Sequence, residues 1–99
     1  MDFLNSYISK IIALCKRHKV SKLFAFGSVL TNRFNQDSDV DLIVDFEGVP
    51  LEEYADNYLE FKYALSDMFG REVDLLEDKA IRNPVFRRSI DKTKQLIYG

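Results

Sequence analysis

Two aspartates separated by a single residue are the side chains in this sequence best suited to chemistry. Asp39 and Asp41 flank Val40 at the start of an apolar run. Strands are poor in aspartate, and alternate residues of a strand project from the same face. If residues 40–44 form a strand, the two carboxylates point the same way, with Cα atoms roughly 7 Å apart. Neighbouring carboxylates repel each other unless a cation lies between them, so the pair indicates a divalent metal site.

A Gly-Ser pair stands upstream of the aspartates, where a buried strand at residues 22–26 is expected to end. Gly27 permits a close backbone approach or a dihedral angle denied to other residues. Ser28 then opens a short helix or turn, where N–H groups and a hydroxyl can contact a phosphate. A serine that merely caps a helix after a turn glycine gives the same pattern. Because the aspartate pair follows, we expect phosphate contact.

A third aspartate lies in a short apolar segment, residues 71–76. If this segment is a strand, Val73 and Leu75 face one way, and Asp74 faces the other with Glu72 and Leu76. An acid on the solvent face of a strand would look the same. Taken alone, Asp74 is therefore interpreted as such a solvated acid.

The elements that must position these residues alternate between helical and extended patterns. Residues 2–18 and 51–69 are predicted helices because their apolar residues recur at helical spacing, from Leu51 through Phe69 in the longer one. Asn83 and Pro84 indicate the N-cap and first residue of a third helix, and the tail 95–98 is expected to be extended. This order predicts an α/β domain, with helices packed against a small mixed sheet.

Three other polar residues are not expected to join the site. Cys15 and His18 could be half of a metal site, but zinc sites need three or four such ligands, and the chain has no other Cys or His. Cys15 is therefore expected to be buried packing and His18 a solvated group at a helix end. Asp45, near the end of its strand, is expected to be a solvated acid and not a ligand.

Composition narrows the class of protein. A chain of 99 residues suits one domain, residues 1–99. The net charge of −2 argues against strong nonspecific binding to nucleic acid. No apolar run approaches the ~20 residues of a membrane helix, and no secretory leader is recognisable. The single cysteine is consistent with a reducing cytoplasm.

The combination of Gly27-Ser28, Asp39-x-Asp41 and Asp74 resembles the nucleotidyltransferase superfamily that includes DNA polymerase beta. At this length the chain looks most like the minimal nucleotidyltransferase (MNT) branch. The resemblance runs from about Lys22 to the C-terminus. It implies the polymerase-beta-like fold, with all three aspartates at one end of the sheet.

The resemblance also implies a reaction. A hydroxyl attacks the α-phosphate of a nucleoside triphosphate, most simply ATP, and pyrophosphate leaves. Two Mg²⁺ ions about 3.5–4 Å apart would assist this step. Asp39 and Asp41 would bind both ions, Asp74 would bind the ion on the attacking side and help take the proton, and Gly27 and Ser28 would hold the β- and γ-phosphates. The acceptor would come from a partner, in similar proteins a small helical HEPN protein paired as toxin with the MNT antitoxin; homo-oligomerisation is left open.

The loop after Ser28 departs from the pattern of similar proteins. They commonly carry arginine directly after the Gly-Ser, a second arginine two residues on, and then glycine; this sequence has Val29, Thr31 and Asn32 there, and Arg33 next. Arginines in that place would be fixed donors to a triphosphate. Two alternatives to an active enzyme follow: a binding module that neutralises a partner toxin by contact, and a nucleotide-sensing subunit.

Overall fold

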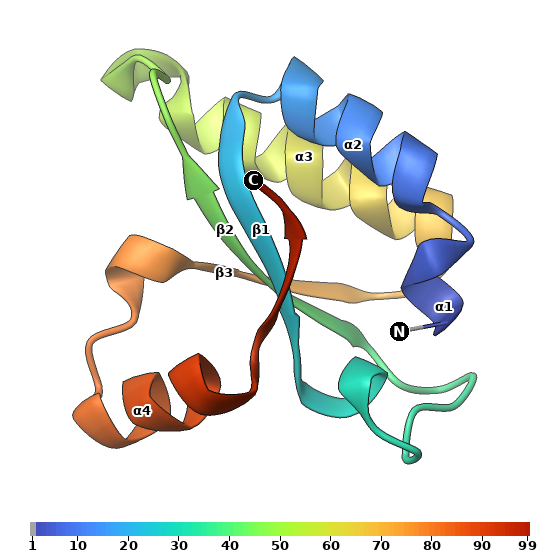
Figure 1. Ribbon diagram of the computed structural model, residues 1–99. Coiled ribbons are helices and arrows are strands. Elements are labelled where there is room, and N and C mark those ends of the chain that lie inside the picture. The colour runs from blue at the N-terminus through green and yellow to red at the C-terminus, as the bar shows by residue number, and fades with distance from the viewer. Residues whose placement is uncertain (1) are drawn as a thin grey trace.

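The computed structural model describes residues 2–99, which form a four-stranded sheet with helices on both faces (Figure 1). No helix within residues 2–99 is both long enough and apolar enough to cross a membrane. In chain order the elements are α1 (Asp2–Asn5), α2 (Ile8–Arg17), β1 (Val20–Phe26), the 3₁₀ turn η1 (Gly27–Leu30), β2 (Val40–Phe46), α3 (Leu51–Phe69), β3 (Val73–Glu77), the 3₁₀ turn η2 (Asp78–Ala80), α4 (Pro84–Thr93) and β4 (Gln95–Tyr98).

The sheet has the strand order β3-β2-β1-β4. β2 pairs with β3 in parallel, whereas β1 is antiparallel to both β2 and β4. The parallel pair requires a crossover, and α3 supplies it. This mixed sheet with covering helices confirms the predicted α/β fold class.

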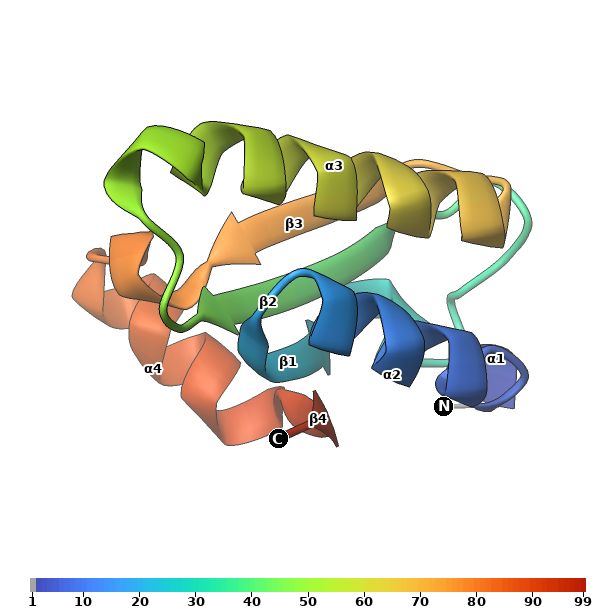
Figure 2. The same ribbon diagram turned by 90° about the horizontal axis from the view of Figure 1, so that it is seen from above.

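One face of the sheet carries the main core. Leu23 and Ala25 of β1 face Val44 and Leu42 of β2, and all four side chains are buried. α2 and α3 lie together over this face (Figures 1 and 2). These two helices contribute the following buried side chains to the core: Ile11, Cys15, Phe61, Leu65 and Phe69. The strand residues between these inward positions must therefore project from the opposite face.

The opposite face is covered only in part, by α4. Phe86 of α4 meets Phe26 of β1 edge to face, with ring centroids 6.4 Å apart, and the Lys94 ammonium lies 4.3 Å from the Phe24 centroid. Both views place α4 apart from α2 and α3 (Figures 1 and 2). Part of this face therefore stays open.

Short sequence patterns correctly predict features of the two later helices, α3 and α4. The observed range of α3 is the predicted one, and Gly70 ends it with a left-handed φ of 67°. Asn83 caps α4 as predicted, because its side chain accepts hydrogen bonds from the N–H groups of Val85 and Phe86. The extended tail is confirmed as β4. The apolar pattern also predicts Leu51 on the buried side of α3; this prediction is wrong, because Leu51 is 89% exposed.

The first helix differs from the prediction because it is broken between α1 and α2. Tyr7 donates its N–H to the Leu4 carbonyl at 2.9 Å, a turn tighter than an α-helical one. The break lets Phe3 and Tyr7 both contact the Phe69 ring, at centroid distances of 5.4 and 5.1 Å. Aromatic packing across the fold therefore outweighs the continuous helical pattern of residues 2–18.

Candidate functional site

The parallel pairing of β2 and β3 brings two of the three aspartates together. Asp41 and Asp74 are Cα partners in the register of these strands. Their neighbours Val40, Val73 and Leu75 are buried on the core face, so Asp41 and Asp74 project side by side from the open face. The predicted direction of Asp74 is confirmed.

Asp39 precedes β2 by one residue and is exposed. By alternation it belongs to the same face as Asp41. Its backbone neighbour Val40 is tied to β3, because the Val40 N–H donates to the Glu72 carbonyl at 3.0 Å. Asp39 therefore lies at the edge of the site, where its side chain is free to turn in solvent.

Asp41 experiences unfavourable charge. Burial, then the charge of Asp74 and then that of Asp39 raise the pKa of the Asp41 carboxyl. None of the salt bridges within residues 2–99 involves Asp39, Asp41 or Asp74. Close carboxylates that no cation of the protein neutralises are typical of a site completed by a bound cation.

The donor chemistry fits magnesium, which prefers hard oxygen ligands. Within residues 2–99, however, no three His, Cys, Asp or Glu side chains stand close enough together to hold an ion. Magnesium does not require such a cage, because it is commonly bound by one or two carboxylates together with substrate phosphates and water. The arrangement therefore fits an open site that a phosphate-bearing substrate completes.

Gly27 lies directly against the Asp41 carboxylate. Phe26 and Asp41 are partners across β1 and β2, and Gly27 follows Phe26 with φ of 73°. A Cβ placed on Gly27 would overlap Asp41 Oδ2 and stand 3.2 Å from Asp41 Cγ. Glycine is therefore needed twice at this position, for its left-handed backbone and for the space that the carboxylate occupies.

Ser28 lies within η1, a turn of only four residues. Its carbonyl accepts hydrogen bonds from the Thr31 N–H and the Thr31 hydroxyl, both at 2.9 Å. The short helix expected at Ser28 is confirmed. Such a turn carries little dipole, so a phosphate here would depend on individual donors.

Arg71 positions the loop that leads to Asp39, and the sequence analysis missed it. Its Nη1 donates to the carbonyls of Asn35 and Ser38, at 2.8 and 2.9 Å. Its guanidinium also lies 4.6 Å from the ring centroids of both Phe3 and Phe34. No local pattern marks these contacts, because all four partners are distant in sequence from Arg71.

Of the residues expected to stay outside the site, Cys15 is fully buried as predicted, whereas the prediction for His18 is wrong. His18 is not solvated: it is 6% exposed, its Nδ1 is 2.9 Å from the Leu14 carbonyl, and its ring packs on Phe61. Asp45 pairs with Lys79 at 3.5 Å on the surface.

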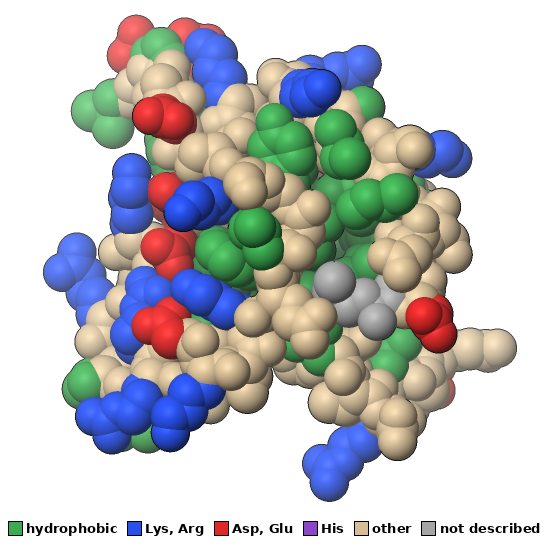
Figure 3. Space-filling view, viewed as in Figure 1, with side chains coloured by type: hydrophobic (Ala, Val, Ile, Leu, Met, Phe, Trp, Pro, Cys, Tyr) green, Lys and Arg blue, Asp and Glu red, His purple; other side chains and the backbone are tan. Residues whose placement is uncertain are grey.

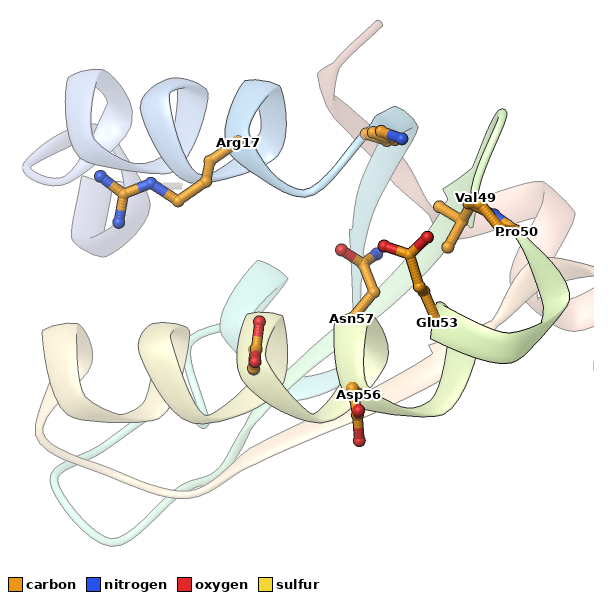
Figure 4. A pocket seen from close by; sticks show the side chains of 8 residues that line it. Arg17, Val49, Pro50, Glu53, Asp56 and Asn57 are labelled. Carbon is orange, nitrogen blue, oxygen red and sulfur yellow. The ribbon is translucent and has the colours of Figure 1, made fainter.

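A polar pocket of about 310 Å³ lies away from the aspartates, where α2, α3 and the turn after β2 meet (Figure 4). Its lining contains basic residues such as Arg17, acidic residues, and the amide of Asn57. Val49 and Pro50 close one side. β1 has seven residues and runs from this end to Gly27, so roughly 20 Å separates the pocket from the site. It plays no part in the chemistry considered below.

Comparison with known proteins assigns the arrangement to a group. Residues 8–97 match the nucleotidyltransferase domain family. A "putative protein adenylyltransferase" from Methanocaldococcus jannaschii is 36% identical over 85 residues, covering 86% of this chain and 82% of the relative.

Solved structures share the fold. A "putative minimal nucleotidyltransferase" has a TM-score of 0.75 and 28% identity, with 95% of this chain and 92% of that chain covered. A structure of tri-AMPylated Shewanella oneidensis HEPN toxin in complex with MNT antitoxin contains a chain that matches with a TM-score of 0.65 and 18% identity, covering 96% of this chain and 71% of that one. At that identity the second match shows the fold alone.

Proposed function

The chain belongs to the nucleotidyltransferase domain family, in its minimal branch, and on this basis we propose that it transfers AMP from ATP to a hydroxyl group of a partner protein. The observation that carries the proposal is the in-register pairing of Asp41 with Asp74 on parallel strands. It gives the open face of the sheet two adjacent carboxylates, with Asp39 at the edge of the same face.

The three aspartates have separate roles in this proposal. Asp39 and Asp41 hold divalent ions. Asp74 shares one of these ions with Asp41 and also faces the acceptor. When bound, Mg²⁺ would supply the positive charge that offsets the phosphates and the carboxylates. Charge that is fixed before the reaction begins stabilises a transition state without reorganisation.

The transfer exchanges one phosphorus–oxygen bond for another. The acceptor oxygen forms a bond to the α-phosphorus, and the bond from that phosphorus to the oxygen of the β-phosphate breaks. Pyrophosphate leaves, and the AMP group remains on the acceptor. Asp74 takes the hydroxyl proton as the new bond forms.

Gly27 and Ser28 are assigned to the β- and γ-phosphates. Gly27 adjoins Asp41, so phosphates bound along residues 27–28 lie next to the carboxylates. The Ser28 side chain is half-buried and its hydroxyl is a donor suited to a phosphate oxygen.

We propose a HEPN-type helical protein as the partner that brings the hydroxyl, most simply that of a tyrosine, in a toxin–antitoxin pair. A chain of this fold occurs in the complex of an AMP-modified HEPN toxin with its MNT antitoxin.

The test is transfer of label from α-radiolabelled ATP to the protein encoded by the neighbouring gene, in the presence of Mg²⁺. We expect a labelled partner with the wild-type protein and none with Asp41→Asn. Asp45→Asn is the matched control, because Asp45 lies on the same strand and face but pairs with Lys79. Absence of transfer by the wild type, or full transfer by Asp41→Asn, would remove the proposal.

A second function is neutralisation of the partner by contact alone. Val29 and Thr31 favour it, because neither offers a charged donor to a triphosphate beside Ser28. It predicts that a variant carrying both Asp39→Asn and Asp41→Asn protects cells from the partner as well as the wild type does. The transfer mechanism predicts loss of protection.

A further inference from the structure

A hollow of about 540 Å³ with a mixed polar and apolar lining opens beside Gly27, on the side of the site away from β3. That volume is within the usual range for small-molecule sites. η1 and the following loop line one side with Ser28, Thr31 and Arg33; the junction of α4 and β4 lines the other with Thr93 and Gln95. Gly27 lines the hollow and also adjoins Asp41, so the hollow lies next to the Asp41 carboxylate.

Among residues 2–99, Arg33 is the only charged residue that lines this hollow. No salt bridge within residues 2–99 involves its side chain, whereas Arg87 and Lys94 on nearby α4 and its C-cap are already paired with Asp78 and Asp91. Arg33 is exposed. Its guanidinium thus retains its full set of donors for a ligand.

The rest of the lining indicates the chemical class of that ligand. Ser28 contributes a hydroxyl donor and Gln95 an amide. The Thr31 and Thr93 hydroxyls already donate to backbone carbonyls, and Leu30 is apolar. In the part of the chain that the structure describes, no aromatic ring lines the hollow to stack on a nucleobase. Hydroxyl and amide donors around a single guanidinium suit a polyanion, because the planar fork of arginine matches phosphate oxygens. A base would find no stacking platform here.

Hydrogen bonds fix the main chain at Arg33 beside this hollow. The Arg33 N–H donates to the Thr31 hydroxyl at 3.2 Å, and that hydroxyl donates in turn to the Ser28 carbonyl at 2.9 Å. On the far side, Gln95 is fixed by its pairing with Ala25 of β1. Two segments that are distant in sequence, residues 27–33 and 93–95, therefore converge on one space.

We propose that this hollow binds the β- and γ-phosphates of the nucleotide and that Arg33 is the cation that holds them, with Ser28 and Gln95 as further donors. Arg33 supplies the positive charge that Val29 and Thr31 do not. This inference rests on the proposed function and assigns residues to its phosphate side. It also places the nucleotide toward β1 and leaves the β3 side, next to Asp74, for the acceptor.

The experiment is calorimetric titration of the protein alone with Mg-ATP, inorganic tripolyphosphate and AMP. Arg33→Gln is expected to weaken binding of Mg-ATP and of tripolyphosphate by the same factor, about 10- to 100-fold, since a hydrogen-bonded charge is lost. AMP, which lacks the outer phosphates, should bind both proteins alike. Arg33→Lys should fall between, because it keeps the charge and loses the fork.

Arg17→Gln is the matched control, since it removes the same charge from the polar pocket at the far end of β1 and should leave Mg-ATP affinity unchanged. If Arg33→Gln binds Mg-ATP as the wild type does while Asp41→Asn does not, the role given to Arg33 is wrong and the proposed function stands. A wild-type protein that binds no Mg-ATP would overturn both.

Discussion

Replacing Gly27 by alanine should separate the function of this site from its stability. The backbone at Gly27 has φ of 73°, a left-handed conformation that costs a residue with a Cβ about 1–2 kcal/mol. The added methyl group would also overlap Asp41 Oδ2. The carboxylate must then retreat, by about 1 Å, and a misplacement of that size can cost about 100-fold in rate.

Gly48 offers a matched control, because it has φ of 75° and no atom lies within 4 Å of the Cβ that alanine would add. Gly48→Ala should therefore carry the same backbone cost without disturbing any side chain. Each kcal/mol lost should lower Tm by about 4–8 °C in a domain of this size.

The assay is AMP transfer to the partner alongside thermal unfolding of both variants. We expect comparable losses of Tm, with transfer reduced about 100-fold in Gly27→Ala and close to wild type in Gly48→Ala. Equal activity of the two folded variants would refute the argument that Gly27 keeps Asp41 in place.

Three further predictions concern other parts of the molecule. Because the pKa of the folded protein's Asp41 carboxyl is raised above its ordinary value of 3.8, ionisation of this group opposes folding at higher pH. Asp41→Asn should therefore raise Tm at pH 7 and lose that advantage below pH 3.8. The same variant should abolish transfer. Arg71→Met should lower the free energy of unfolding by about 2–3 kcal/mol, measured by urea titration, because two hydrogen bonds and two ring contacts are lost, and should reduce transfer by freeing the loop before Asp39. Burial raises the pKa of the Cys15 thiol to about 12, so alkylation at pH 8 should require unfolding; rapid labelling of the native protein would contradict its buried position.

The surface beside the site has its own charge pattern. Acidic and basic side chains intermingle near α4 rather than separating into a basic stripe (Figure 3). Part of this mixture is explained by pairs such as Lys79 with Asp45 and Arg87 with Asp78. These pairs neutralise Arg87 and Lys79, whereas no salt bridge within residues 2–99 involves Arg33.

Sequence patterns predicted what depends on neighbouring residues. The range of α3, the Gly70 C-cap and the Asn83 N-cap rest on local spacing and on dihedral preferences that one or two residues carry. The faces of the strands followed from alternation, so the side of the sheet that carries Asp74 was also predictable.

Patterns could not predict what depends on distant contacts. The break before α2 reflects ring packing between Tyr7 and Phe69, and His18 is buried because Phe61 of α3 covers it. The register that sets Asp41 beside Asp74 is fixed by pairing across the α3 crossover. In the sequence, only the family resemblance implies that these two aspartates lie next to each other.

The central claim is that Asp41 and Asp74 hold the same ion. Its most direct test is to locate Mn²⁺, used in place of Mg²⁺, in crystals grown with a non-hydrolysable ATP analogue. An anomalous difference peak within bonding distance of both carboxylates is the result we predict. Asp74→Asn should lower the occupancy of that peak while Asp45→Asn leaves it unchanged. A peak bound by neither carboxylate, or one that Asp74→Asn does not alter, would contradict the account.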